Sequence, residues 1–121
     1  MNKKILIIED EKSLVDMYQE KLEQSGFKTF FTMEMEEGLR LFEKEKPDLI
    51  LLDILLPRDS GIVFLQRLEE KFGEISVPIL AFSNYDDLET KNKAEKLGVE
   101  EYLIKTNYTP GEVVEKIKKY I

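Results

Sequence analysis

Histidine, cysteine and tryptophan are absent from this sequence of 121 residues. Without His and Cys, the chain has no Ser-His-Asp triad, no cysteine nucleophile, no disulfide framework and no His/Cys zinc site. Any chemistry must therefore use carboxylates, hydroxyls, lysines and a cation that prefers oxygen ligands.

Basic residues are the minority among the charges, with 18 Lys plus Arg against 25 Asp plus Glu and a net charge of −7. A DNA-binding protein gains most of its affinity by neutralising phosphates, so this charge argues against direct binding to nucleic acid or to an anionic membrane. Apolar runs such as 49–52 are too short to span a bilayer, and the N-terminal residues do not resemble a signal peptide. We therefore expect a cytoplasmic location.

Short apolar segments alternate with longer segments of helical period. The short ones are rich in leucine, β-branched and aromatic residues without polar alternation, which is typical of parallel strands covered on both faces by helices. The length of the chain predicts a single domain, residues 1–121. The strict alternation predicts a doubly wound α/β sandwich fold. The predicted strands are residues 4–9, 27–32, 48–53, 77–82 and 101–105.

The helical segments have apolar residues at spacings of three and four, and glycines follow three of them at 26, 73 and 98, where left-handed cap residues are expected. Thr109 to Glu112 reads as a capping box. The weakest helical pattern is 86–97, whose apolar residues are Leu88, Ala94 and Leu97.

Polar side chains follow several of the predicted strands. Glu9-Asp10, Asp53, Ser83 and Lys105 stand at or just after strand ends. Ligand sites in such sheets lie outside the carboxyl ends of the strands, so these side chains are expected to converge at one edge.

Three carboxylates held close together need a cation, because like charges raise the pKa of at least one of them. An all-oxygen ligand set favours Mg²⁺, with Mn²⁺ as a possible replacement. Asp53, alone on the central strand, is the natural nucleophile toward phosphorus, with Glu9 and Asp10 as metal ligands and Lys105 as a charge for a phosphoryl oxygen. Taken singly, each has a simpler interpretation; Asp10, for example, could cap a helix beginning near Lys12.

The chain resembles the receiver domain of two-component response regulators over essentially its whole length. The matching segments are Ile7-Ile8-Glu9-Asp10, Leu51-Leu52-Asp53-Ile54-Leu55-Leu56-Pro57 with Ser60-Gly61, Ala81-Phe82-Ser83 and Tyr102-Leu103-Ile104-Lys105. The resemblance implies a flavodoxin-like (βα)5 fold with strand order 2-1-3-4-5.

The resemblance also implies a Mg²⁺-dependent phosphorylation-activated switch rather than a metabolic enzyme. Asp53 is implied as the phosphoacceptor, served by a sensor histidine kinase or a His-containing phosphotransfer protein. Glu9, Asp10 and Asp53 are the implied metal ligands, completed by the backbone carbonyl of Leu55.

The remaining implied site residues are Ser83 as the switch hydroxyl, Tyr102 as the switch aromatic and Lys105 as the phosphate-pairing lysine. The output surface is the face around 83–121, which would contact an unknown downstream protein. Phosphorylation is expected to shift the conformational equilibrium of 86–97.

The sequence departs from the family pattern in the loops. Thr106 replaces the usual proline after Lys105, and Asn84 stands where a smaller residue is common. The bulky Leu55 and Tyr85 are expected to shield the acyl phosphate from water and slow its hydrolysis.

Three other functions are weighed against this one. A Mg²⁺-dependent aspartyl phosphatase typically has a second Asp where this chain has Leu55. A flavin-binding module must bind the phosphate of its cofactor, and the acidic run Glu9-Asp10-Glu11 would repel that phosphate. A degenerate receiver acting as a docking scaffold stays open. So does the choice between a stand-alone receiver and part of a longer regulator.

Overall fold

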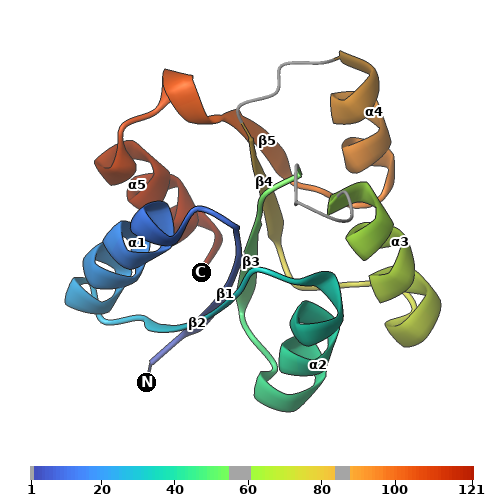
Figure 1. Ribbon diagram of the computed structural model, residues 1–121, viewed down its shortest axis with the longest axis horizontal. Helices are drawn as coiled ribbons and strands as arrows, with labels where there is room; N and C mark the ends of the chain where they lie inside the picture. Colours follow the sequence, from blue (N-terminus) through green and yellow to red (C-terminus); the bar gives the residue numbers. More distant parts are fainter. Residues whose placement is uncertain (1, 55–60, 84–87) are drawn as a thin grey trace.

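A computed structural model describes residues 2–54, 61–83 and 88–121. Within them, strands and helices alternate along the chain (Figure 1). The strands are β1 (Lys4–Ile8), β2 (Lys28–Thr32), β3 (Leu49–Leu52), β4 (Ile79–Ser83) and β5 (Glu101–Ile104). The helices are α1 (Lys12–Gln24), α2 (Met35–Glu45), α3 (Gly61–Phe72), α4 (Leu88–Lys96) and α5 (Pro110–Tyr120), with a short 3-10 helix η1 (Lys105–Asn107) after β5.

The sheet has the strand order β2-β1-β3-β4-β5, and every neighbouring pair is parallel. Ile8 is in register with Leu52 across β1 and β3, and Ser83 with Ile104 across β4 and β5. The carboxyl ends of these strands therefore lie at one edge of the sheet, and the predicted fold class and strand order are confirmed.

Alternate strand residues supply two separate core layers. Leu6 and Ile8 of β1 belong to the layer under α2, α3 and α4, whereas Ile5 and Ile7 belong to the layer under α1 and α5. Figure 1 shows the corresponding arrangement, with α1 and α5 on one face of the sheet and α2, α3 and α4 on the other. Because successive side chains of a strand point to opposite faces, a strand that is buried on both faces is apolar throughout.

Backbone chemistry explains several of the element boundaries. Gly26, Gly73 and Gly98 have φ values of 94°, 76° and 100°, as expected for left-handed residues at helix ends. Thr109 and Glu112 form the predicted capping box at the start of α5. The predicted strand 77–82 is shifted: β4 begins at Ile79, one residue after Pro78, which has no N–H to donate to a neighbouring strand.

The fourth helix is weakly anchored, as its sequence indicates. Ala94 is its buried residue within the described part of the chain. Leu88, one of the three apolar residues of this segment, is 70% exposed. It is the first residue of α4.

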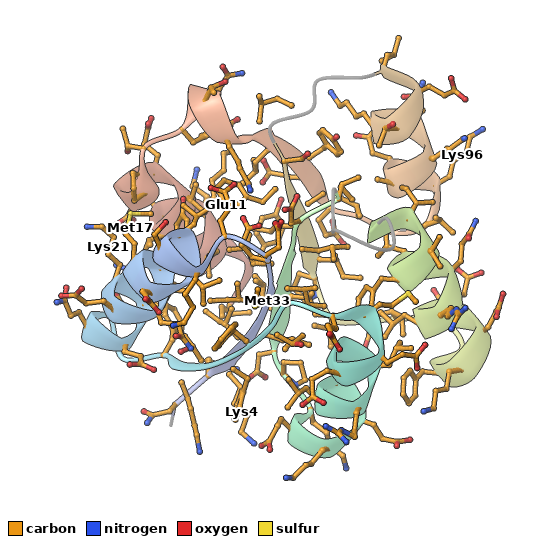
Figure 2. All side chains as sticks on the ribbon, viewed as in Figure 1. Lys4, Glu11, Met17, Lys21, Met33 and Lys96 are labelled. Carbon is orange, nitrogen blue, oxygen red and sulfur yellow. The ribbon has the colours of Figure 1, made fainter. Side chains whose placement is uncertain are left out.

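Charged side chains cover the outer surfaces of the helices (Figure 2). Lys21 near the end of α1 and Lys96 at the end of α4 both project outward in this view. Over the described ranges, none of the helices has the length and apolar content needed to cross a membrane.

Candidate functional site

Glu9 and Asp53 continue directly from buried strands. The backbone N–H of Glu9 donates to the carbonyl of Thr32 at 3.1 Å, and the N–H of Asp53 donates to the carbonyl of Ile8 at 2.8 Å. These bonds extend the ladders beyond the last residues of β1 and β3. Both acids are consequently held at the sheet edge by the backbone rather than by a loop.

The three predicted metal ligands lie together. Carboxylate oxygens of Glu9, Asp10 and Asp53, one from each residue, all lie within 4.8 Å of one another. Glu9 and Asp53 are buried, with 3% and 4% of their surfaces exposed, and Asp10 is half-buried. The backbone N–H of Asp10 donates to Glu9 Oε2 at 2.9 Å, which fixes the orientation of the Glu9 carboxylate.

Lys105 is the nearest positive charge to these acids in the described structure. Its Nζ lies 2.5 Å from Glu9 Oε1, 3.3 Å from Glu11 Oε1 and 3.5 Å from Asp53 Oδ2. Its side chain is 9% exposed. Lys105 follows β5 as the first residue of η1, two strands away from Asp53 in the sheet. The expected convergence of an ammonium with the acids is therefore present.

The pKa values respond to burial and to these neighbours. Burial, followed by the interaction with Asp53, raises the pKa of Glu9 to about 8 against the opposing effect of Lys105. Burial by itself would lower the pKa of Lys105, but the hydrogen bond to Glu9 and the charges of Asp53, Glu9 and Glu11 raise it overall. The cluster therefore holds more negative charge than a single ammonium can neutralise when every acid is ionised.

A divalent cation fits this donor set. Two buried carboxylates and one half-buried carboxylate offer only oxygen ligands, the preference of Mg²⁺ and Mn²⁺. Burial and the neighbouring Asp53 raise the pKa of Glu9, and a bound cation would favour its ionised form. Glu9, Asp10 and Asp53 are the residues that could hold it.

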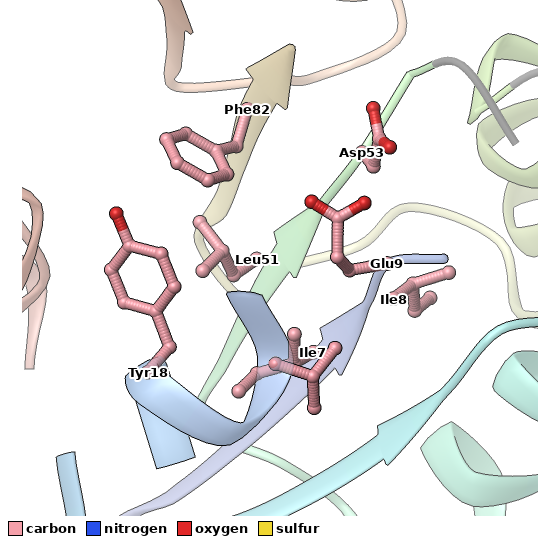
Figure 3. Close-up of a pocket in the computed structure, with 8 residues that line it drawn as sticks. Ile7, Ile8, Glu9, Tyr18, Leu51, Asp53 and Phe82 are labelled. Atoms are coloured by element: carbon pink, nitrogen blue, oxygen red, sulfur yellow. The ribbon is translucent and has the colours of Figure 1, made fainter. Parts of the chain in front are cut away.

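Below the acids, a small enclosed cavity adjoins the apolar core. It measures about 10 Å³, room for roughly one water molecule, and Glu9 and Asp53 line it together with Tyr18 and Phe82. Figure 3 shows the carboxylates of Glu9 and Asp53 near each other, with Leu51 between them and Tyr18. The acids therefore lie between solvent on one side and an aromatic and aliphatic floor on the other.

Asp10 does not cap α1. That helix begins at Lys12, as expected, but its N-cap residue is Glu11, which makes no side-chain capping hydrogen bond in the described structure. The alternative interpretation of Asp10 is thus not what the structure shows. Its backbone instead serves the Glu9 carboxylate, and its own carboxylate joins the acidic cluster.

Ser83 and Tyr102 lie on the two strands beside this cluster. Ser83 is fully buried as the last residue of β4, rather than the first residue after it. Tyr102 is half-buried on β5 and packs against the core layer under α2, α3 and α4. Its register partner is Ala81, two residues before Ser83 on β4. Both predicted switch residues are therefore on adjacent strands.

Several sequence predictions fall outside the described residues. These are Leu55 as a carbonyl ligand, Leu55 and Tyr85 as a shield, and the first two residues of segment 86–97. Asn84, which departs from the family pattern, also lies outside them. They stay predictions.

Sequence reasoning did not identify Glu11 and Phe82 as parts of the site. Glu11 contacts Lys105, and the Phe82 ring lies beneath the same ammonium, with 5.3 Å between Nζ and the ring centroid. Glu11 belongs to the acidic run after β1, and Phe82 immediately precedes Ser83, so adjacency to predicted site residues was the available signal.

Known proteins that are similar to this chain belong to one family. Residues 5–118 match the model of the response regulator receiver domain. The chain is 38% identical over 118 residues to the alkaline phosphatase synthesis transcriptional regulatory protein PhoP of Bacillus subtilis, covering 98% of this chain and 48% of that protein. The chain thus spans about half the length of this relative.

Solved structures of receiver domains share the fold. A CheY-like response regulator receiver domain protein from Methanospirillum hungatei superposes with a TM-score of 0.89 at 28% identity, covering 98% of this chain and 93% of the other. Chemotaxis protein CheY4 of Vibrio cholerae superposes with a TM-score of 0.90, covering all of both chains, and at 21% identity this likeness concerns the fold alone. Family match, sequence relative and site geometry lead to one conclusion: the chain belongs to the response regulator receiver domain family.

Proposed function

We propose that Asp53 accepts a phosphoryl group from the phosphohistidine of a sensor histidine kinase or a His-containing phosphotransfer protein. The supporting observation is the grouping of Glu9, Asp10 and Asp53 within 4.8 Å at the sheet edge, with the Lys105 ammonium against two of them. As a receiver domain, the chain is a signalling domain switched by phosphorylation. The roles of individual residues are the content of the proposal.

In the proposed reaction, a carboxylate oxygen of Asp53 attacks phosphorus. The new O–P bond makes an acyl phosphate, the P–N bond to the donor histidine breaks, and its electron pair stays on the imidazole nitrogen. Asp53 is suited to this role because it follows a strand buried throughout and its backbone is hydrogen-bonded to Ile8. The missing histidine of this chain is supplied by the partner.

Glu9, Asp10 and Asp53 would hold Mg²⁺, and the backbone carbonyl of Leu55 is proposed as a further ligand. When bound, the cation supplies positive charge for the transferring phosphoryl oxygens. Mn²⁺ is the alternative occupant. The absence of His and Cys from the chain leaves oxygen as the ligand atom.

Lys105 would pair with a phosphoryl oxygen on Asp53. To do so it must exchange its contact with Glu9 at 2.5 Å for one with the phosphoryl group beside Asp53, from which it now lies 3.5 Å away. Ser83 would donate a hydrogen bond to the same group, and Tyr102 would move toward greater burial. Together these changes would alter the neighbouring α4 surface.

The output surface is proposed to be the face formed by residues 83–121, toward an unknown downstream protein. The weak anchoring of α4, with Ala94 buried and Leu88 exposed, supports a surface whose conformation changes at low energetic cost. We propose a cytoplasmic location, and we propose that this segment itself contacts neither nucleic acid nor membrane. The longer relative PhoP is named as a transcriptional regulatory protein, and that activity concerns the relative.

The test is phosphorylation with a small donor. The protein is incubated with MgCl2 and acetyl phosphate or phosphoramidate, and the intact mass is measured. Wild type is expected to gain one phosphoryl group, and Asp53→Asn is expected to gain none. The control Asp16→Asn, which changes an exposed position on α1, should gain one phosphoryl group like wild type. Chelation of Mg²⁺ should abolish the gain in mass.

The same experiment separates the rival functions. A docking scaffold would gain no phosphoryl group with Mg²⁺ present, and labelling that persists in Asp53→Asn would place the acceptor elsewhere. A metabolic phosphatase would release phosphate over many turnovers, whereas we propose a single stoichiometric phosphorylation followed by slow self-dephosphorylation.

A further inference from the structure

Phe82 contacts the site through the face of its aromatic ring. It is the penultimate residue of β4, is 4% exposed, and belongs to the core layer under α1 and α5. Lys105 Nζ lies 5.3 Å from the centroid of this ring. This is within the range over which an ammonium is attracted to the negative face of an aromatic ring.

Tyr18 fixes the orientation of that ring. The centroids of Tyr18 and Phe82 lie 5.4 Å apart with an interplanar angle of 88°, an edge-to-face arrangement. Tyr18 is 2% exposed on α1, so both rings are held by core packing. Figure 3 shows the two side chains next to each other on the side of Leu51 away from Asp53.

The ring differs in kind from the charged partners of the Lys105 ammonium in the described structure. The remaining close partners, Glu9, Glu11 and Asp53, are carboxylates, and two of these are proposed ligands of the divalent cation. An ammonium that loses Glu9 and Asp53 to a cation keeps two close partners, the exposed carboxylate of Glu11 and the buried Phe82 ring. Phe82 carries no charge and does not compete for the cation, so its attraction for Lys105 persists when the carboxylates are occupied.

We propose that Phe82, held by Tyr18, is a positioning residue that keeps the Lys105 ammonium at the strand edge, ready to pair with the phosphoryl group. This inference rests on the proposed function, since it assigns to Phe82 a part in the phosphorylation of Asp53. An aliphatic residue at position 82 would keep the position apolar but present no negative face. The ring therefore has a role beyond packing.

The test weakens or removes the negative face of the ring at position 82. Position 82 is substituted by 3,4,5-trifluorophenylalanine, which weakens the negative face, and by leucine, which removes it. The rate constant for phosphorylation by acetyl phosphate is measured at saturating Mg²⁺. We expect Phe82→Leu to lower it by about three- to tenfold and the trifluoro ring to give an intermediate value.

A matched variant accounts for loss of packing. Ile117→Val removes one methyl group from the same buried layer, on α5, and should phosphorylate at the wild-type rate despite a lower melting temperature. A rate in Phe82→Leu and in the trifluoro variant equal to wild type would overturn the proposal. So would an equal slowing in Ile117→Val, because the effect would then belong to packing.

A spectroscopic measurement is independent of phosphorylation. Protons on the Lys105 ε-carbon should show an upfield ring-current shift in the NMR spectrum, assigned by its loss in Lys105→Arg. The shift should disappear in Phe82→Leu and persist in the trifluoro variant and in Tyr18→Phe. If the wild-type shift is absent, the positioning fails. If the shift is present but wild type gains no phosphoryl group, the proposed function fails instead.

Discussion

Lys105 lies nearer to Glu9 than to Asp53, with Nζ–oxygen distances of 2.5 Å and 3.5 Å. The ammonium is thus paired first with a proposed metal ligand and only second with the proposed phosphoacceptor. In this arrangement Lys105 neutralises part of the charge that a divalent cation would neutralise. Lysine and cation are therefore expected to compete for Glu9.

Lys105→Met should accordingly strengthen Mg²⁺ binding to the unphosphorylated protein, by about tenfold, because it removes a neighbouring positive charge. The same variant should be phosphorylated more slowly, because it lacks the charge for the phosphoryl oxygen. Isothermal titration calorimetry measures the first effect and intact mass against time the second. Lys116→Met, which removes an ammonium paired with Glu101, is the control. Weaker Mg²⁺ binding in Lys105→Met would contradict the competition.

Mg²⁺ affinity should depend on pH through Glu9. In the metal-free protein its pKa of about 8 leaves it largely protonated at neutral pH, so binding must displace a proton. Affinity should rise with pH by up to about tenfold per unit until it levels off above the pKa. Titrations in buffers of different ionisation enthalpy should show proton release at neutral pH. Glu9→Gln should bind more weakly and lose most of this dependence; a flat wild-type profile would exclude the displacement.

The raised pKa of Glu9 should also make the stability of the metal-free protein depend on pH. Because the pKa of Glu9 is raised from 4.5 to about 8, the folded metal-free protein favours the protonated acid. The corresponding stability is fully present below 4.5 and is lost as the pH rises through about 8. Chemical unfolding of metal-free protein should show this decline, and Glu9→Gln should reduce it. A decline of equal size in Glu9→Gln would assign it to another group.

Gly61→Ala should destabilise the protein by about 1–3 kcal/mol, because it forces atoms into a packed backbone. A Cβ at Gly61 would lie 2.8 Å from the Cα of Ile54 and 2.9 Å from the carbonyl oxygen of Asp53. Gly111→Ala is the control, since the nearest atom to its added Cβ would be Thr109 Oγ1 at 4.0 Å. Urea unfolding should separate the two variants. Equal stabilities would show that the backbone at Ile54 yields to the added methyl group.

Tyr120→Phe should cost about 1 kcal/mol near neutral pH by removing a hydrogen bond to a carboxylate. The Glu101 carboxylate accepts two hydrogen bonds, one from the Tyr120 hydroxyl at 2.5 Å and one from Lys116 Nζ at 2.9 Å. Burial raises the pKa of Glu101, but these two hydrogen bonds outweigh it and lower the pKa below 4.5. The stability gained is present above 4.5 and lost as the pH falls through the lowered pKa. The gap between wild type and Tyr120→Phe should therefore shrink in acid.

Thermal unfolding from neutral to acidic pH measures this gap. Tyr108→Phe is the control, because it keeps the ring that lies 5.5 Å from Lys116 Nζ and removes only a hydroxyl. A gap that stays constant as Glu101 is protonated would contradict the assignment.

Local patterns in the sequence were sufficient to predict the alternation of elements, the parallel sheet and the convergence of acids at its edge. The convergence of Glu9, Asp10 and Asp53 could be predicted because the first two follow β1 in succession and Asp53 follows β3 directly. Parallel strands bring their carboxyl ends to one edge. The capping box at Thr109 and the left-handed Gly98 were readable for the same reason, since they depend on neighbours in the chain.

Only the tertiary structure determined which side chains of the site are in contact. The preference of Lys105 for Glu9 over Asp53, the Phe82 ring beneath the ammonium and the Tyr18 edge against that ring join residues far apart in the sequence. The exposure of Leu88 was likewise determined by the tertiary structure. Periodicity predicts which face of an element is buried. Contact distances depend on strand register, on the layer into which each side chain points and on which helix covers it, and these are properties of the assembled sheet.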